Sequence, residues 1–567
     1  MMEYEILLVN VVRDFGGYSD CFRESIGQYL LASYLRTKSF KAFVYSGNAI
    51  ETKKIISNEI EKNKVPVIGF YAAADNIRIV KHIITWIKTK YPYIITIIGG
   101  PQAIGLDYHF FSDSKNDYAI VGEGEIPLHM LLSSIIDKDC LIEEVPAIVY
   151  PDYEKKKLII NQCDNAVIKD LDIIPYPTMQ DSLLRNLRQG KMAGIITGRG
   201  CPNHCTFCYE GANAKNVRFR SIDNVMEEID YIIENNSKFE YLNIYDDTFT
   251  LRKDRVLDFC KKISKRNIKW FCEGHVTFVL KNSDVISEMI KAGMLCIQFG
   301  IESGSNKVLQ GYNKKTDYHM IVEAITICKK MGIHGITGNF IIGGAFETVE
   351  TIEESKRLAK DLIYGAKGII ELYSVYFAPY PNTKIVNKPY CFNIKLNSKF
   401  QEYNLNTMRS PVVETKELTT VDIYNLKEEF DLYLEEVYHQ AAIESTKADV
   451  IQGLFVDGKR EHLNPIWERH YMSLEYIVNF IEHLSETEQQ FNENFYMIRT
   501  FEDVVLDGEV LVSKYGKYTG LDKEVLLNAT GIYTAKEMAE MFGVSLDEIK
   551  KIFIKYNDKC MLYMSEF

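Results

Sequence analysis

The sequence lacks long apolar segments. None of its apolar runs reaches the roughly 18 residues that cross a bilayer, which excludes a membrane-spanning helix. The first ten residues, MMEYEILLVN, also lack the basic segment and following apolar segment of a secretory signal. We therefore expect a cytoplasmic protein with no membrane partner.

The sequence also lacks an excess of basic residues. Lys and Arg number 66 against 78 Asp and Glu, and the formal net charge is −12. A broad nucleic-acid surface needs a basic face, so this balance disfavours a nucleic-acid partner. Low-complexity segments and convincing repeats are absent as well. The hydrophobic share of 46% is that of an ordinary globular protein, and 567 residues predict three or four domains.

Residues 1–150 alternate short apolar runs with amphipathic stretches. The alternation predicts an α/β domain with a doubly wound, Rossmann-type parallel sheet, which binds ligands at the carboxyl ends of its strands. Two glycine-rich turns follow such strands, Gly99-Gly100-Pro101 and Gly122-Glu123-Gly124-Glu125. The expected strands are 6–12, 42–45, 67–71, 94–98 and 118–121, and the expected helices are 24–36, 51–63, 76–90 and 125–136.

Residues 151–187 look like a linker, and residues 188–385 repeat the β/α alternation six times. Six units are fewer than the eight of a closed barrel, so the pattern predicts a partial (β/α)6 barrel with its active groups at the strand carboxyl ends. Ser221 and Ser283 are expected to cap two of the helices. The expected strands are 193–197, 241–245, 268–272, 296–300, 335–342 and 369–376, and the expected helices are 222–236, 253–265, 284–292, 317–331 and 348–363.

The rest of the chain is mainly helical. Residues 386–495 form the expected helical region, with patterns around 420–445 and 472–490. Residues 496–567 indicate short strands followed by two helices, 534–542 and 545–556, with Gly543 between them. That spacing is typical of a helix-turn-helix and predicts a winged-helix-like module. The simplest interpretation of this module is a structural cap, and the alternative is a module that binds the leader peptide of a peptide substrate.

Twelve cysteines in a chain of this length do not suggest a disulfide framework, but three of them are tightly grouped. They stand in the sequence Gly198-Arg-Gly-Cys201-Pro-Asn-His-Cys205-Thr-Phe-Cys208. Three thiolates at this spacing can bind three irons of a [4Fe–4S] cluster and leave the fourth iron open. The alternative is a zinc site, which normally needs four protein ligands, and no suitable fourth ligand stands nearby. The other nine cysteines form no second motif and are interpreted as buried apolar thiols.

The cysteine motif, placed after the first strand of a partial barrel, resembles the radical S-adenosylmethionine (SAM) superfamily. The stretches 218–221, 245–249, 300–304 and 343–347 look like conserved blocks of one subgroup. The resemblance implies that Cys201, Cys205 and Cys208 hold the cluster. It also implies SAM contacts from Phe207, Arg220, Ser221, Glu302, Ser303, Phe340, Ile342 and Gly344.

Five further residues are candidates for catalysis. By resemblance, Asp246 and Asp247 line the mouth after the second barrel strand. Glu273 and His275, at the end of the third strand, are candidates to touch the substrate, and Tyr376 is a candidate to line the cavity. The alternatives are helix-capping carboxylates, structural polar contacts and core packing.

The domain ahead of the motif is similar to the cobalamin-binding domains of class B radical SAM enzymes. The two glycine-rich turns and the stretch 170–175 carry this resemblance, which with the barrel blocks covers about residues 1–380. Glycine turns would let the backbone approach the flat corrin. The implied cobalamin contacts are Tyr71, Ala72, Gly99, Gly100, Pro101, Gln102, Gly122 and Glu123.

The first-strand loop departs from the cobalamin-binding pattern. It reads Val12-Arg-Asp-Phe-Gly-Gly17 and has no histidine, so a corrin held here would have no histidine from that loop on its cobalt. The third strand ends Tyr71-Ala-Ala-Ala74, where the family often has Ser or Thr. A sheet of corrin-domain shape that binds no corrin is therefore the alternative.

The resemblance implies a cobalamin-dependent radical SAM methyltransferase. SAM would be cleaved to a 5′-deoxyadenosyl radical that takes hydrogen from an unactivated carbon of a small-molecule or peptide substrate, and methylcobalamin would supply the methyl group. A flavodoxin or ferredoxin would be the electron donor. One alternative is a radical SAM oxidoreductase, cyclase or peptide maturase without cobalamin. The other is a corrin-sensing regulator with a helix-turn-helix, which would not need the three-cysteine motif.

Overall fold

The computed structural model describes residues 4–12, 26–163, 166–178, 191–213, 216–396, 410–483, 493–502, 504–507 and 509–565. The chain divides into two compact units. The first comprises Met1–Met320, Asn339–Ser355 and Ser374–Glu428, and the second comprises Ile321–Gly338, Lys356–Tyr373 and Glu429–Phe567. None of the described helices is both long and apolar enough to cross a membrane. The domain boundaries expected from the sequence remain predictions.

The N-terminal sheet has seven strands in the order β2-β1-β3-β4-β5-β6-β7. The first five strands pair in parallel, and the order reverses between β1 and β3 as in a doubly wound sheet. The hairpin β6–β7 extends this sheet antiparallel into the segment expected as a linker. The strands are β1 (Ile6–Val11), β2 (Ala42–Gly47), β3 (Val67–Tyr71), β4 (Ile95–Gly99), β5 (Tyr118–Ile120), β6 (Ile148–Asp152) and β7 (Lys157–Ile160).

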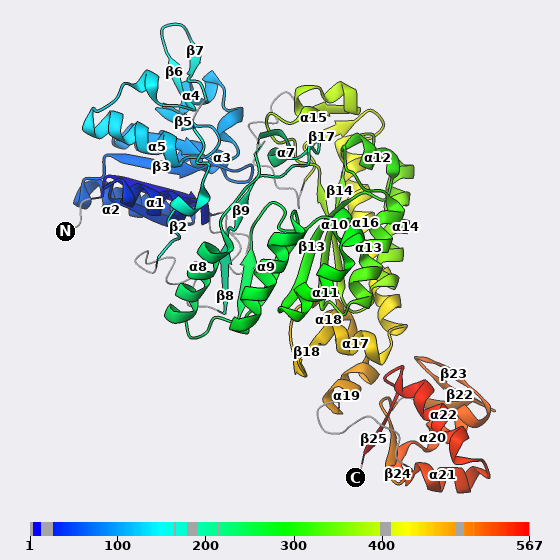
Figure 1. The fold of residues 1–567 in the computed structure, drawn as a ribbon. Coiled ribbons are helices and arrows are strands. Elements are labelled where there is room, and N and C mark those ends of the chain that lie inside the picture. The colour runs from blue at the N-terminus through cyan, green and yellow to red at the C-terminus, as the bar shows by residue number, and fades with distance from the viewer. Residues whose placement is uncertain are drawn as a thin grey trace. The chain divides into compact units, whose positions relative to one another are not determined.

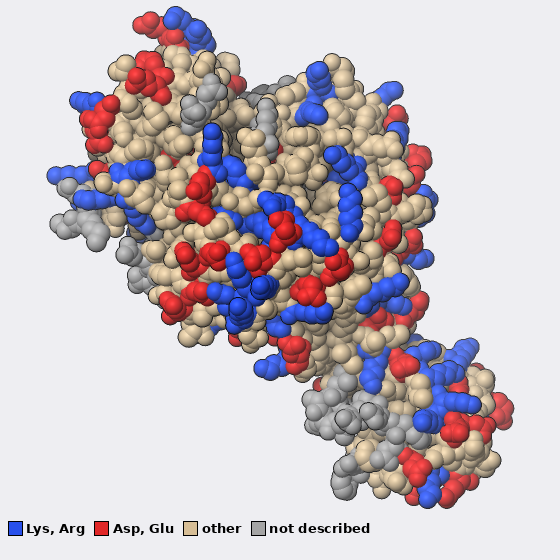
Figure 2. All heavy atoms as spheres, in the orientation of Figure 1, with Lys and Arg blue, Asp and Glu red and all other residues tan. Residues whose placement is uncertain are grey.

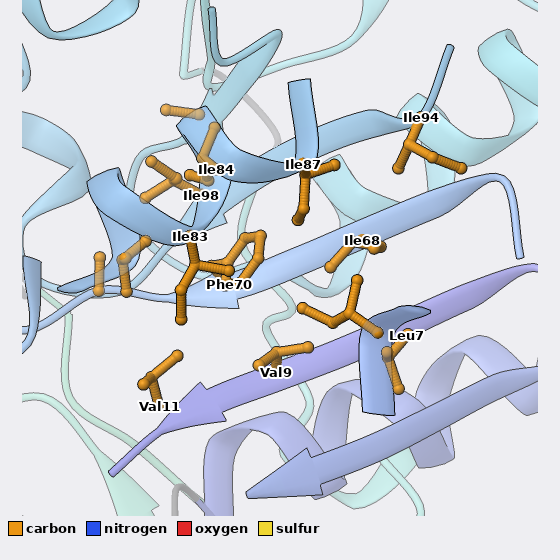
Figure 3. Close-up of a cluster of buried hydrophobic side chains, with 14 of the residues drawn as sticks. Leu7, Val9, Val11, Ile68, Phe70, Ile83, Ile84, Ile87, Ile94 and Ile98 are labelled. Carbon is orange, nitrogen blue, oxygen red and sulfur yellow. The ribbon is translucent and has the colours of Figure 1, made fainter. Parts of the chain in front are cut away.

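Helices cover the N-terminal sheet, and α3 shows why they pack there. Its buried residues Ile77, Val80, Ile83, Ile84 and Ile87 recur at helical spacing and form one apolar stripe. Figure 3 shows this stripe meeting the side chains of β1, β3 and β4 in one core. The helices are α1 (Ile26–Thr37), α2 (Ala49–Asn63), α3 (Ile77–Lys90), α4 (Tyr108–Ser114) and α5 (Glu125–Leu132).

The second sheet has six strands in sequential order, β8-β11-β12-β13-β14-β15, as an open partial barrel requires. Pairing from β8 to β13 is parallel. The strands are β8 (Met192–Ile195), β11 (Tyr241–Ile244), β12 (Lys269–Gly274), β13 (Met294–Glu302), β14 (Gly335–Ile342) and β15 (Ile370–Tyr376). A small hairpin of β9 (Gly198–Arg199) and β10 (Arg218–Phe219) lies between β8 and β11 in the chain.

Helices alternate with the barrel strands as the sequence predicts (Figure 1). Ser221 caps α8 by accepting a hydrogen bond from the Asn224 amide, as expected. The expectation for Ser283 is wrong by one position, because α11 begins at Ser283 and Asn282 is its N-cap residue. The barrel helices are α8 (Ile222–Asn235), α9 (Lys253–Ile263), α10 (Val276–Lys281), α11 (Ser283–Lys291), α12 (Asn306–Gly311), α13 (Tyr318–Lys330) and α14 (Val349–Gly365).

The chain after the barrel begins with α15 (Lys384–Asn387) and a small hairpin of β16 (Ile394–Leu396) and β17 (Val413–Thr415). Helices then dominate, and part of the expected helix 472–490 lies outside the described residues. They are α16 (Thr420–Ile443), α17 (Lys447–Leu454), α18 (Pro465–Met472) and α19 (Glu475–His483), with the short strands β18 (Phe455–Val456) and β19 (Lys459–Arg460) after α17.

The last part of the chain contains the two predicted helices, α21 (Ala535–Phe542) and α22 (Leu546–Asn557). Each begins with a capping box, Thr534 with Glu537 and Ser545 with Glu548. Gly543 ends α21 in the left-handed conformation at φ 66°, which glycine adopts without strain. The remaining elements are β20 (Tyr496–Arg499), β21 (Val504–Asp507), β22 (Val510–Ser513), β23 (Gly516–Tyr518), α20 (Gly520–Asn528), β24 (Thr530–Thr534) and β25 (Leu562–Ser565).

Replacing Ile84 by Ala tests the core of the N-terminal sheet. Ile84 has no exposed surface, so we expect Ile84→Ala to lower the free energy of unfolding by about 2–5 kcal/mol, through lost apolar burial and the cavity left behind. The control is Ile50→Ala, because the Ile50 side chain is 82% exposed. Chemical denaturation measures both, and equal shifts would contradict this packing.

Candidate active site

The three clustered cysteines lie in one loop between β9 and α7 (Tyr209–Asn213), in the first unit. All three thiols are half-buried, and the Cys208 amide donates to the Cys205 carbonyl at 3.2 Å. Thr248 Oγ1 lies 3.6 Å from Cys201 Sγ. No three His, Cys, Asp or Glu side chains of the described residues converge as a single metal ion requires. A cubane needs no such convergence, because each thiolate binds a different iron.

Two adjacent carboxylates at the end of β11 hold the backbone that leads into this loop. Asp246 Oδ1 accepts hydrogen bonds from the amides of Thr197 at 2.6 Å and Gly198 at 3.0 Å. Asp247 Oδ2 accepts from the Gly200 amide at 2.9 Å. Asp246 is buried, whereas Asp247 lines the large cavity described below. Both carboxylates thus fix the backbone of the segment before Cys201 by direct hydrogen bonds.

A buried ion pair lies beyond the end of β13. Lys314 Nζ is 2.6 Å from Glu302 Oε1, and Asn339 Nδ2 donates to Glu302 Oε2 at 3.0 Å. Burial alone would lower the pKa of Lys314, but Glu302 and Cys205 together outweigh it and the net shift is upward. Lys314 therefore keeps its positive charge beside the cysteine loop. Glu302 itself adopts a left-handed φ of 64°, a conformation that is uncommon outside glycine.

Glu273 lies near the end of β12, and His275 directly follows the strand. Glu273 is open to solvent but surrounded by protein, and desolvation, helped by Asp247 and Glu302, raises its pKa to about 7. Desolvation first, and then Lys314, lowers the pKa of His275 to about 4. The neutral His275 ring uses Nδ1 toward Thr277, where it caps α10. Glu273 can thus gain or lose a proton near neutral pH, whereas His275 stays uncharged.

Aromatic rings close one side of the cysteine loop. The Phe207 and Tyr312 rings lie 4.7 Å apart, between centroids. The Tyr312 hydroxyl approaches Gly344 so closely that a Cβ there would lie 1.6 Å from it. Phe340 and Ile342 are fully buried. Their assignment to SAM therefore remains a prediction.

A cavity of about 630 Å³ opens at the carboxyl ends of β3, β4 and β5. An added Cβ at Gly99 or Gly122 would meet no atom within 4 Å, so both turns present bare backbone to this space. The cavity has the size of a small-molecule site and a mainly apolar floor. Its floor includes Leu8, Leu31, Gly69, Ile97, Ile120 and Leu128.

The same cavity reaches the cysteine loop. Its wall includes Gly198, Arg199 and Gly200 of the segment before Cys201, together with Asp247. Glu210, two residues after Cys208, also lines it, and burial followed by the charges of Asp247 and Glu123 raises the Glu210 pKa to about 7. The glycine turns of the first sheet and the cysteine loop therefore face one shared space.

The model of the radical SAM superfamily matches residues 195–359, which span the cysteine loop and the strands from β11 to β14. Residues 195–359 form a radical SAM domain. The chain is also similar to an uncharacterized methyltransferase of Pyrococcus horikoshii. The two are 28% identical over 342 residues, which are 59% of this chain and 70% of that protein. Three further curated relatives are covered over 35 to 61% of their length.

Two solved structures share the fold. One is the cobalamin-dependent S-adenosylmethionine radical enzyme OxsB with aqua-cobalamin and S-adenosylmethionine bound, at 15% identity and a TM-score of 0.62. The match covers 97% of this chain and 78% of that one. The other is the radical S-adenosylmethionine methyltransferase TsrM from Kitasatospora setae with cobalamin and a [4Fe–4S] cluster bound. Its identity is 13% and its TM-score 0.60, over 83% of this chain and 100% of that one.

Several predicted SAM contacts of the radical SAM domain have partners within the protein. Arg220 Nη1 lies 2.5 Å from Glu228 Oε2, and its other donors bond to Asn224 and to the Ile196 carbonyl. Ser221 caps α8. Ser303 is fully buried, with its hydroxyl 3.2 Å from that of Ser355. Their assignment to SAM remains a prediction.

The cavity collects most of the predicted cobalamin residues. Ala72 and Gln102 are not among its lining residues, and the Gln102 amide instead donates to the Ala72 carbonyl at 3.1 Å. The loop from Arg13 to Gly17 lies outside the described residues, and the described lining contains no histidine. Tyr71, Gly99, Gly100, Pro101, Gly122 and Glu123 do line it.

The sequence patterns did not predict the buried pair partners Lys314 and Asn339, or the ion pairs that Arg199 makes with Glu123 and Glu125. The only signal in the sequence was the basic pair Lys314-Lys315 after the fourth barrel strand. Among the other cysteines, Cys163 and Cys391 are exposed, so their interpretation as buried thiols was wrong. Tyr376, a predicted catalytic residue, is 2% exposed with the Lys427 ammonium 5.2 Å from its ring centre.

Glu347, in the turn after β14, tests the electrostatics of the radical SAM domain. It is 1% exposed and accepts hydrogen bonds from the amides of Gly343 and Gly344. Burial outweighs these bonds and raises its pKa to about 7, from 4.5. The folded chain therefore binds this proton more tightly than the unfolded chain does. The stability it contributes below pH 4.5 is lost as the pH rises to about 7.

The variant Glu347→Gln removes this titration. We compare the free energy of unfolding of the variant with that of the native chain. As the pH rises from 5 to 8, we expect this difference to change in favour of the variant by on the order of 3 kcal/mol. Glu350→Gln is the control, because Glu350 is exposed and its pKa is lowered. Denaturant unfolding at both pH values measures the difference. A Gln variant that loses relative stability at pH 8 would show that Glu347 is ionised in the fold.

Proposed function

We propose that the chain is a cobalamin-dependent radical SAM enzyme that methylates an unactivated carbon of its substrate. One observation carries the proposal. The glycine-lined cavity of the N-terminal sheet is also lined by the residues on either side of the three cysteines, Gly198–Gly200 and Tyr209–Glu210. A corrin in that cavity and a cluster on that loop would therefore act on one substrate.

The cluster would be held by Cys201, Cys205 and Cys208. Three thiolates leave one iron open, which SAM can bind through its amino and carboxylate groups. Lys314 lies close enough to Cys205 for the Cys205 thiolate to raise the pKa of the Lys314 ammonium. Lys314 can therefore stay charged and pair with the carboxylate of SAM. Glu302, already paired with Lys314, supplies a carboxylate for the amino group.

The cavity fits a corrin in two respects. Bare backbone at Gly99 and Gly122 lets a flat ring approach without meeting side chains. The apolar floor beneath can take the ring's apolar edge. When bound, the cluster and the cobalamin supply the electron for SAM cleavage and the methyl group, respectively. The described lining offers cobalt no histidine.

This chain's own residues would position the reactants and move protons. Asp246 and Asp247 fix the cysteine loop against the barrel. Glu273, open to solvent and with a pKa near 7, is the group suited to take or give a proton at the substrate. Neutral His275 can offer a hydrogen bond without adding charge.

The substrate class is proposed as a small molecule or a peptide. Basic and acidic side chains are interspersed on the face shown in Figure 2, which gives no continuous basic surface there for a nucleic acid. A flavodoxin or ferredoxin would donate electrons in the reducing cytoplasm. The last module of the chain, with its two capped helices, is proposed as a structural cap.

Replacing Cys201, Cys205 and Cys208 together by Ala should abolish iron binding and SAM cleavage, because no ligand set for the cluster would remain. Iron analysis and chromatography of 5′-deoxyadenosine measure this. The control is Cys163→Ala/Cys391→Ala, which removes two exposed thiols. The proposal fails if the triple variant still forms 5′-deoxyadenosine with SAM and dithionite.

Filling the cavity should separate the corrin from the cluster. The Cβ of Gly99→Phe would meet no atom within 4 Å and would direct the ring from a cavity-lining position, so we expect a folded protein with full iron content that no longer takes up hydroxocobalamin. Gly365→Leu is the control, because Gly365 is exposed and also open. Absorbance after gel filtration measures uptake. If the native chain takes up no corrin, the radical SAM enzyme works without cobalamin.

A further inference from the structure

Two arginines face each other on the hairpin that brackets the cysteine loop. Arg199 of β9 and Arg218 of β10 are direct partners in the antiparallel ladder. Like charges opposite one another on a hairpin are destabilising. The hairpin therefore needs negative charge from outside its own two strands.

The turn after β5 supplies that charge. Glu123 Oε2 lies 3.0 Å from Arg199 Nη1 and 3.1 Å from Arg218 Nη1, and Glu123 Oε1 accepts from Arg218 Nη2. Glu125 Oε1 lies 2.7 Å from Arg199 Nη2. One carboxylate thus bridges both guanidinium groups. We call these four residues the arginine clamp.

The clamp is largely shielded from water. The exposed side-chain fractions are 18% for Arg199, 14% for Arg218, 24% for Glu123 and 4% for Glu125. Removing one partner of such a group leaves an uncompensated charge in a desolvated place. The four side chains therefore hold together as one unit rather than as separate surface pairs.

The clamp joins the two parts of the proposed site. Gly122 and Glu123 form the cavity wall, and Arg199 stands two residues before Cys201. The backbone of that segment is held from the barrel side by Asp247, through the Gly200 amide. The arginine clamp thus fixes the same segment, Gly198–Gly200, from the side of the cavity.

We propose that the arginine clamp sets the position of the cluster loop relative to the corrin cavity. Its members are positioning residues, because they act through the loop and the turn rather than on the reacting atoms. This inference rests on the proposed function. This positioning role gives a reason for the charges at Glu123, Glu125 and Arg199. The ion pairs between them connect the Gly122–Glu125 turn to the segment before Cys201.

The test uses the full chain with Glu123→Gln/Glu125→Gln, which keeps the side-chain size and one acceptor oxygen on each residue but removes both negative charges. The matched control is Asp230→Asn. It breaks another bidentate pair, in which Arg266 Nε and Nη2 each lie 2.6 Å from an Asp230 oxygen, away from the cavity. Both variants should retain the native iron content.

Amide hydrogen exchange of the cluster-loaded, corrin-free protein is the first readout. We expect peptides covering residues 119–131 and 197–201 to exchange several-fold faster in the clamp variant, and at the native rate in the control. Equal rates in the clamp variant and the native chain would overturn the proposal. This readout stands even if the native chain takes up no corrin and the proposed function fails.

Electron paramagnetic resonance is the second readout, on protein loaded with hydroxocobalamin and reduced so that both cofactors are paramagnetic. The native chain should show magnetic coupling between cobalt and cluster, because their sites share a wall. We expect this coupling to weaken in the clamp variant and to remain in the control. Unchanged coupling in the clamp variant would show that the clamp does not position the loop, even where exchange is faster.

Discussion

The cysteine loop depends on hydrogen bonds from backbone amides to two neighbouring carboxylates. Asp246 is 3% exposed, and burial raises its pKa although Thr197, Gly198 and Arg255 act in the opposite direction. A carboxylate in such a place is costly unless its hydrogen bonds are made. The amides before Cys201 are therefore committed to fixed positions. Since the thiolates follow directly in the chain, their placement derives from the end of β11.

The second constraint is the absence of side chains where the two sheets face one space. Gly99 ends β4, Gly122 lies in the turn after β5, and Gly198 and Gly200 flank Arg199 in the same cavity wall. At Gly200 a Cβ would lie 2.7 Å from the Asn216 carbonyl oxygen, so the hairpin itself requires glycine there. On the sheet side, by contrast, a Cβ would meet nothing. Gly200 thus allows close backbone packing within the β9–β10 hairpin, whereas Gly99 and Gly122 leave room for a ligand.

Most strands of the two sheets and the position of the cysteine loop could be predicted from the sequence, because both depend on patterns among residues close together in the chain. Apolar runs gave the strands of both sheets, and the cysteine spacing gave the cluster loop. The hairpin β6–β7 was missed because only the first two residues of β6 are buried. Pro151 lies within β6, and Ile160 at the end of β7 is 67% exposed. Such edge strands lack the apolar alternation on which a prediction depends.

The pairing of charges could not be predicted in the same way. Glu123 and Arg218 form an ion pair although they are 95 residues apart in the sequence. Glu302 and Lys314 form an ion pair across the helix α12 that lies between them in the chain. The stretch Arg218-Phe-Arg220 looks like one binding block in the sequence. In the fold, Arg218 meets a carboxylate of the N-terminal sheet whereas Arg220 meets Glu228 of α8. Sequence motifs therefore predicted candidate site residues, and long-range pairs decide which partners each of them has in the fold.

We propose that the three cysteines hold a cluster with one iron open to SAM. Electron paramagnetic resonance of the anaerobically reduced protein, recorded with and without SAM, measures this. We expect the spectrum of a reduced [4Fe–4S] cluster whose g values change when SAM is added. Identical spectra in the two samples would contradict it, because a cluster with four protein ligands has no iron for SAM to bind.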